Sequence, residues 1–146
     1  MPDSFDAIGV WTQALLTNRF IALTLGGTLG THARYWLDRW ISTAAWSRGF
    51  PWGTLVVNLS GSFLLGLVGM FVLERLPSSQ RGWYLLMGSG FCGAFTTFST
   101  FEWQTFRLVR DGNWWFALLN VTGNVLLGLA GIALAVLLVG TLVPRR

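Results

Sequence analysis

The chain has 146 residues, of which 53% are hydrophobic and only 11% are charged. Because about a quarter of the residues of a soluble domain are charged, this composition excludes an ordinary soluble protein and predicts one helical membrane domain. The net charge is +4, and all ten cations are arginines scattered between apolar runs, so they form no basic patch for a nucleic acid.

Residues 1–19 form an amino-terminal tail that we expect to lie at the membrane interface. Four mainly apolar runs follow, each expected to form one transmembrane helix, and together they make one transmembrane domain over residues 20–142. Their approximate ranges are 20–41, 51–74, 82–109 and 113–142. The expected fold is therefore all-α and integral to a membrane, with four spans.

The third run contains Gly88–Phe101, which combines glycines, a pair of threonines and alternating aromatic residues. Unpaired backbone groups are tolerated at membrane depth only inside a protein bundle or beside a cavity. The segment therefore indicates a helix that is broken at its centre and that interacts with an ion there. Close packing through small residues is the alternative, and Cys92 fits that role as a small packing residue.

Polar residues repeat every four positions on the second and fourth runs, so each set shares one helix face. These residues are Thr54, Asn58, Ser62 and Gly66 on one run, and Asn120, Asn124 and Gly128 on the other. A buried asparagine is unfavourable unless its amide is hydrogen-bonded. Hydrogen bonds between helices would satisfy these amides, and donation to an anion is the functional alternative.

On a continuous third helix, Phe98 and Phe101 share one face and can turn their positive ring edges towards an anion. The same geometry places three hydroxyl residues opposite them: Thr96, Ser99 and Thr100. Core packing is the simpler role for the two rings. Arg34 interrupts the first run and is either a side chain reaching the interface or a positive element of a vestibule.

The arginines give almost no orientation signal, because four spans leave five of them on one side and four or five on the other. A chain without a preferred orientation can insert both ways, and two copies can then pair antiparallel. The sequence contains no catalytic triad, carboxylate pair or phosphate loop, so an enzyme is not expected.

Three motifs carry a resemblance to a known family: Gly26–Tyr35 (GGTLGTHARY), Pro51–Phe63 (PWGTLVVNLSGSF) and Gly90–Phe101 (GFCGAFTTFSTF). In this order they resemble the signatures of the fluoride ion channel family, called Fluc or CrcB. The resemblance implies a dual-topology antiparallel homodimer that encloses two fluoride pores.

The resemblance also implies residue roles. Backbone carbonyls of Gly93 and Thr96 would hold a structural Na⁺ at the dimer centre, and Arg34 would belong to a vestibule. The pore residues would be Asn58, Phe98, Phe101, Ser99, Thr100, Asn120 and Asn124. The last two stand where the family often has Tyr and Ser, and the family's acidic residue past the second Phe is replaced by Gln104 or displaced to Glu102.

The function implied is passive export of fluoride across a bacterial inner membrane. A small proton-coupled drug antiporter is the main alternative, but it needs a carboxylate deep in its first span, and residues 20–33 contain none. A membrane scaffold without transport is the other alternative.

Overall fold

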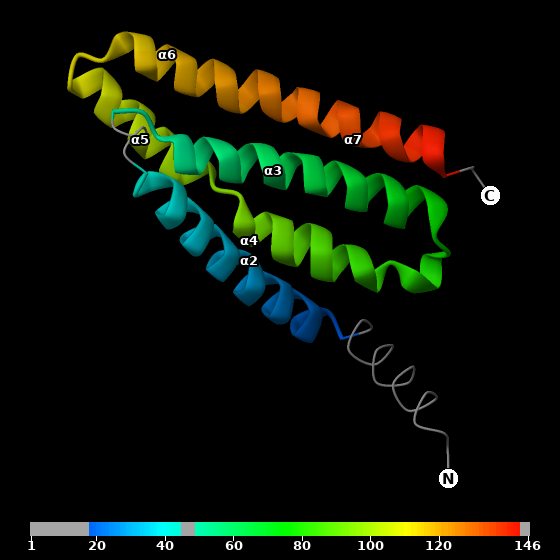
Figure 1. Ribbon diagram of the computed structural model, residues 1–146. Coiled ribbons are helices and arrows are strands. Elements are labelled where there is room, and N and C mark those ends of the chain that lie inside the picture. Colours follow the sequence, from blue (N-terminus) through cyan, green and yellow to red (C-terminus); the bar gives the residue numbers. More distant parts are fainter. Residues whose placement is uncertain (1–17, 45–48, 144–146) are drawn as a thin grey trace.

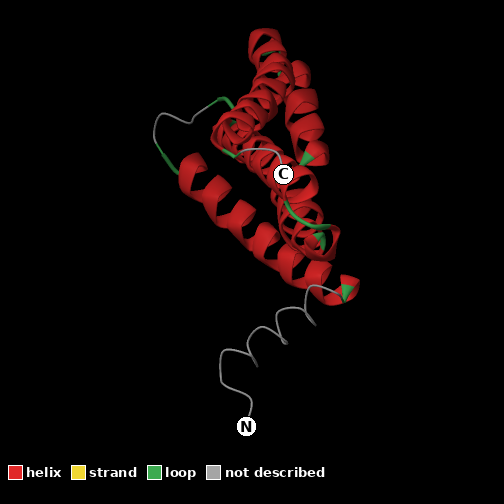
Figure 2. Ribbon diagram, turned by 90° about the vertical axis from the view of Figure 1, so that its right-hand side faces the viewer, coloured by secondary structure: helices red, strands yellow, loops and turns green. Residues whose placement is uncertain are grey.

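The computed structural model describes residues 18–44 and 49–143, and within these ranges every regular element is helical (Figure 1 and Figure 2). The tail predicted over residues 1–19 lies outside the described residues up to position 17. The first helix, α2 (Arg19–Ser42), begins where the Asn18 side chain accepts hydrogen bonds from the N–H groups of Phe20 and Ile21. This cap satisfies donors that have no partner within the helix.

The second and fourth helices are long and apolar. The second comprises α3 (Trp52–Val68) and the wider π-helical turns of η2 (Gly69–Leu73). The fourth comprises α6 (Trp114–Thr122), η5 (Gly123–Leu127) and α7 (Gly128–Leu142). Their 22 and 29 residues are each long and apolar enough to cross a membrane, judged by length and composition alone. In Figure 1, α7 lies along α3, against which it packs.

The third helix follows a short turn, η3 (Ser78–Gln80), and is made of two pieces. The first piece is η4 (Tyr84–Cys92) with α4 (Gly93–Phe95), and the second is α5 (Phe98–Arg110). Between them the backbone of Thr96 and Thr97 is extended, with ψ angles of 160° and 116°. The expected four helices and the break in the third are both confirmed.

Glycines bring α2 into backbone contact with the first piece of the third helix. A Cβ atom at Gly26 would collide with the carbonyl oxygen of Leu86, and one at Gly30 with that of Phe91. These two positions are four residues apart and therefore share one face of α2. The contact explains why the first motif is rich in glycine, and it fixes the position of the segment that leads to the break.

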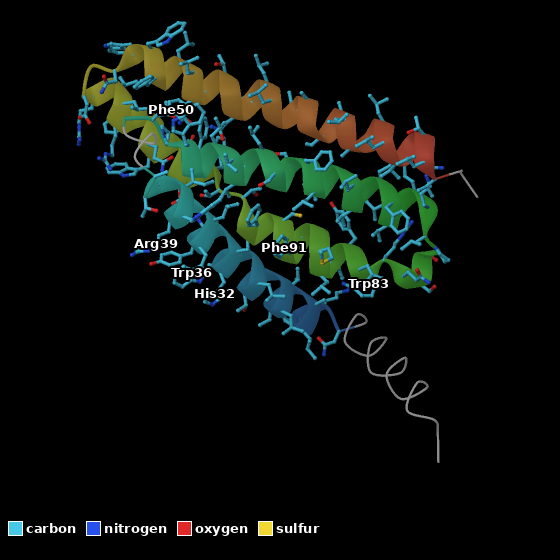
Figure 3. All side chains as sticks on the ribbon, viewed as in Figure 1. His32, Trp36, Arg39, Phe50, Trp83 and Phe91 are labelled. Carbon is cyan, nitrogen blue, oxygen red and sulfur yellow. The ribbon has the colours of Figure 1, made fainter. Side chains whose placement is uncertain are left out.

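Large apolar side chains cover much of the surface. Phe20, Leu126 and Leu137 are between 63% and 85% exposed, whereas Cys92 is only 2% exposed and packs inside. Figure 3 shows His32, Trp36 and Arg39 along one outward side of α2, where all three are exposed. A surface of this composition is suited to lipid or to a second copy of the chain.

Candidate functional site

Asn58 on α3 holds the break in the third helix open. In a continuous helix the N–H of Thr97 would donate to the carbonyl of Gly93, four residues earlier. Here it donates to Asn58 Oδ1 over 2.8 Å instead. The Asn58 amide also donates from Nδ2 to the carbonyl of Thr97, over 3.1 Å. The Asn58 side chain therefore takes the place of the Gly93 carbonyl as acceptor for the Thr97 N–H. The Gly93 carbonyl in turn lacks this N–H as a donor.

A chain of hydrogen bonds continues from Asn58 across three helices. Asn58 Nδ2 donates to Asn124 Oδ1 (2.8 Å), and Asn124 Nδ2 donates to the backbone carbonyl and Oδ1 of Asn120 (2.8 and 3.0 Å). Asn120 Nδ2 donates to Thr105 Oγ1 (2.8 Å), which donates to the carbonyl of Phe101 (2.9 Å). The hydrogen bonds between helices that the sequence left open are therefore present for all three asparagines.

An open groove, hereafter the groove, runs beside the break. It encloses about 240 Å³, and its polar and aromatic lining comprises Asn58, Ser62, Thr96, Thr97, Phe98, Phe101 and Asn124. None of its lining residues is ionisable. The rings of Phe98 and Phe101 lie 5.6 Å apart at 52°, with Phe98 69% exposed and Phe101 only 7%. The groove thus offers ring edges and neutral polar groups to an ion.

Gly61 allows α3 to approach the break closely. A Cβ atom there would collide with Thr96 Cγ2 and come within 3.0 Å of the Phe95 ring. Any larger residue would push the break away from α3, and the hydrogen bonds of Asn58 to Thr97 depend on that distance. Gly61 in the second motif is thus explained by close packing of α3 against the third helix.

A second hollow, called the Arg34 pocket below, lies between α2, α3 and α5 and encloses about 230 Å³. Its polar lining comprises Thr31, Arg34, Tyr35, Asp38, Thr54, Thr97 and Thr100. The Nε atom of Arg34 is buried and has no hydrogen-bond partner.

Asp38 lies one turn from Arg34, yet the two form no ion pair in the described part of the chain. The Asp38 carboxylate lies instead against the first turn of α3, where a Cβ atom at Gly53 would collide with Oδ1. The N-cap residue of that helix, Pro51, provides no side-chain hydrogen bond, so the carboxylate is placed to stabilise the positive end of the helix. The positive charge of Arg34 is therefore left available to the pocket.

A family model described as "CrcB-like protein, Camphor Resistance (CrcB)" matches residues 21–136. The chain belongs to this CrcB-like family. A relative from Solibacter usitatus (strain Ellin6076), named fluoride-specific ion channel FluC, is 43% identical over 82% of this chain and 97% of its own length. Relatives of the same name from Magnetococcus marinus (46% identical, 72% of this chain and 84% of the relative) and Pyrococcus horikoshii (36%, 85% and 94%) are similar.

Membership of the CrcB-like family implies that the helices are membrane helices, as the composition predicts. Within the described ranges no three His, Cys, Asp or Glu side chains gather as a metal site. Hard cations also bind backbone carbonyl oxygens. Gly93 fits such a role, because its carbonyl has lost the N–H of Thr97 and the residue is exposed.

The structure brings together some of the residues predicted for the site and separates others. Asn58, Thr96, Phe98, Phe101 and Asn124 line the groove, and Arg34 and Thr100 line the Arg34 pocket. Asn120 is fully buried and is connected to the groove through its hydrogen bonds with Asn124. Gly93, Ser99 and Glu102 are exposed.

The prediction that Thr96 lies on the face opposite the two rings is wrong. It assumed one continuous helix, but the break separates Thr96 from α5, and Thr96 lines the groove with Phe98 and Phe101.

Two residues of the site were missed. Thr97 caps α5, its Oγ1 accepting from the Thr100 N–H over 3.2 Å. The second, Thr105, ends the chain of amides at α5. A threonine at the start of a helical segment is a recognised cap signal that could have identified Thr97. Nothing in the local sequence marks Thr105.

Proposed function

We propose that this protein is a fluoride-specific ion channel that releases fluoride from the cell passively. The groove carries the proposal, because it combines the ring edges of Phe98 and Phe101 with neutral amides and hydroxyls. Fluoride is small and strongly hydrated, so a pore must replace its water by close donors in a low-dielectric site. Relatives that cover most of the chain are named fluoride-specific ion channels.

Neutral lining groups favour a channel over a coupled transporter. No carboxylate lines the groove, so nothing there can exchange a proton for the anion. A proton-coupled drug antiporter would need such a group, and a membrane scaffold would need no groove. The proposed function is that of a channel and not of an enzyme.

The pore is completed by a second, antiparallel copy of the chain in the proposed assembly. A single copy leaves the groove open and Phe98 69% exposed, which would put polar groups in contact with lipid. The balanced arginines suit insertion in both orientations, and two copies related by a two-fold axis would enclose two pores. The proposed location is a bacterial inner membrane.

A structural Na⁺ at the dimer centre is proposed to join the two breaks. The Gly93 carbonyl lacks its helical partner, and the extended backbone of Thr96 ends the same segment. Two carbonyls from each copy would give four oxygen ligands, which suit a hard cation. The ion would stabilise carbonyl groups that are otherwise unpaired at membrane depth.

Within each pore, Asn58 and Asn124 would meet the ion together with the two rings. Asn120 would position Asn124 through its carbonyl and Oδ1. Arg34 would attract anions, and Thr100, which lines the same pocket, would offer a hydroxyl on the way in, followed by the exposed Ser99.

A flux assay tests the function directly. Liposomes containing the purified full chain and loaded with equal fluoride and chloride should release fluoride rapidly when the membrane potential is collapsed, with no coupling gradient of protons or cations. Release is followed with electrodes selective for each anion. Chloride release at the same rate as fluoride, or no release of fluoride, would contradict the proposal.

A further inference from the structure

A third hollow lies at the far end of α5, and it is called the α5 hollow below. It encloses about 340 Å³ between the end of this helix, the turn before α3 and the loop before α6. Its lining includes Pro51, Gln104, Arg107, Asp111 and Asn113. Unlike the groove, it contains charged side chains.

The charge of Arg107 is available to this hollow. Among the described residues the only ion pair joins Arg110 Nε to Asp111 Oδ1 over 3.1 Å. Asp111 also lines the hollow, but its Oδ1 atom is paired with Arg110, whereas Arg107 lines the hollow and has no ion pair with any described residue. Both arginines lie in the last turn of α5, where a positive charge is favourable beside the helix end. They differ in that only Arg107 is unpaired and directed to a cavity.

Gln104 lies between this hollow and the groove. It follows Phe101 by three residues and Thr100 by four, so it is their neighbour one turn along α5. Its Oε1 atom is buried without a hydrogen-bond partner, although the residue lines the hollow. A half-turn of the amide exchanges this oxygen with the NH₂ group and presents two donors at the same place.

We infer that the α5 hollow is an anion vestibule at the end of the pore, in which Arg107 attracts the anion and Gln104 donates to it on its way to Phe101. The inference rests on the proposed function. From Phe101 to Gln104 to Arg107 the residues advance by about 4.5 Å and turn by about 60° at each step. This spacing places Gln104 and Arg107 along α5 beyond Phe101, and neither residue lines the Arg34 pocket.

The test compares Arg107→Gln with Arg39→Gln in liposomes that contain the full chain. Initial fluoride release is measured at low fluoride concentration, in about 10 mM and about 500 mM of an impermeant salt, because screening shortens the range of a charge. Arg107→Gln should lower release about 3- to 10-fold at low ionic strength and less than about 2-fold at high ionic strength. Arg107→Lys should retain the rate, and Arg39→Gln, which lies on the outward side of α2 and does not line the hollow, should leave it unchanged.

Gln104→Met provides a second arm, because it keeps the volume of the side chain and removes its donors. A short-range hydrogen bond is not screened, so release should fall at both ionic strengths. Equal losses for Arg107→Gln and Arg39→Gln would identify both arginines as surface anchors and overturn the inference. A loss of fluoride release for Arg107→Gln that is the same at both ionic strengths would also overturn the inference. An unchanged rate of release for Gln104→Met would do the same.

The proposed function can fail separately. Wild-type protein that releases no fluoride would overturn the channel itself, whereas a conducting wild type with an unaffected Arg107→Gln variant would overturn only the vestibule.

Discussion

The groove and the Arg34 pocket meet at Thr97, which lines both, yet they differ in chemistry. The groove is neutral and bordered by aromatic rings, while the pocket holds Arg34 and Asp38. A charged wall attracts an anion from a distance but also retains it, whereas neutral donors replace its water and let it leave. We interpret the difference as a division between attracting the ion and conducting it.

The largest expected effect comes from the ring that borders the groove. Phe98→Ile should lower fluoride release about 100-fold, equivalent to about 3 kcal/mol in the barrier, because the ring edge is lost where the second copy of the proposed assembly would exclude water. The side chain is exposed in the single chain, so folding should be little affected. Flux and elution volume in detergent would be measured together, with Phe106→Ile on the same helix as the control. Equal fluxes for the two variants would assign Phe98 to packing.

Asn58→Asp changes the other wall of the groove. The carboxylate can still accept from the Thr97 N–H, but it cannot donate to Thr97 or Asn124, and it adds a negative charge. Fluoride release should fall about tenfold or more through repulsion in a low-dielectric site. Leaving buried acceptors unpaired should also lower the free energy of unfolding by about 1–3 kcal/mol.

Ser60→Ala is the matched control for Asn58→Asp, because the Ser60 hydroxyl bonds only to carbonyls of its own helix. Thermal unfolding and flux are both recorded. A functional Asn58→Asp variant as stable as the control would contradict the role given to the asparagine.

Removing the positive charge of the Arg34 pocket should have a smaller effect on fluoride release, and this effect should depend on the salt concentration. Arg34→Gln is expected to lower fluoride release about 5-fold at low ionic strength, with most of the loss recovered at high ionic strength. Arg39→Gln, on the outward side of α2, is the control. A loss of 100-fold at every salt concentration would place Arg34 in the conducting path and remove the proposed division.

The smallest effect is expected at the end of the amide chain. Thr105→Val keeps the shape of the side chain but removes the acceptor of Asn120, which should lower the free energy of unfolding by about 1 kcal/mol. Flux should change less than about 2-fold, because Thr105 does not line the groove. Thr122→Val is the control, since its hydroxyl bonds only to its own helix. Chemical denaturation in detergent checks the difference.

The four helices and the break could be predicted because they follow from local properties. Apolar runs separated by polar loops give the helices, and glycines with paired threonines weaken the third one at Thr96 and Thr97. The residue that holds the break could not be predicted in the same way. Asn58 is 39 residues from Thr97 in sequence, and only packing around Gly61 brings them together.

The positions of side chains were predicted less well where they depend on the course of the backbone. Assuming a continuous helix put Thr96 on the wrong face, because two extended residues reset the direction of every side chain beyond them. Asn120 shares a helix face with Asn124, but only Asn124 reaches the groove, while Asn120 faces Thr105. The spacing of residues in the sequence predicts which face of a helix they share, but it does not predict how deeply each of them is buried.

The chain of amides has a consequence for how long an ion stays in the groove. Both N–H groups of the Asn58 side chain, and both of Asn124, already donate to protein oxygens. An anion that takes one of these donors breaks an existing hydrogen bond, so it gains only the difference between two similar interactions. The groove would therefore bind fluoride weakly, with a short residence time, and this weak binding is what rapid permeation requires.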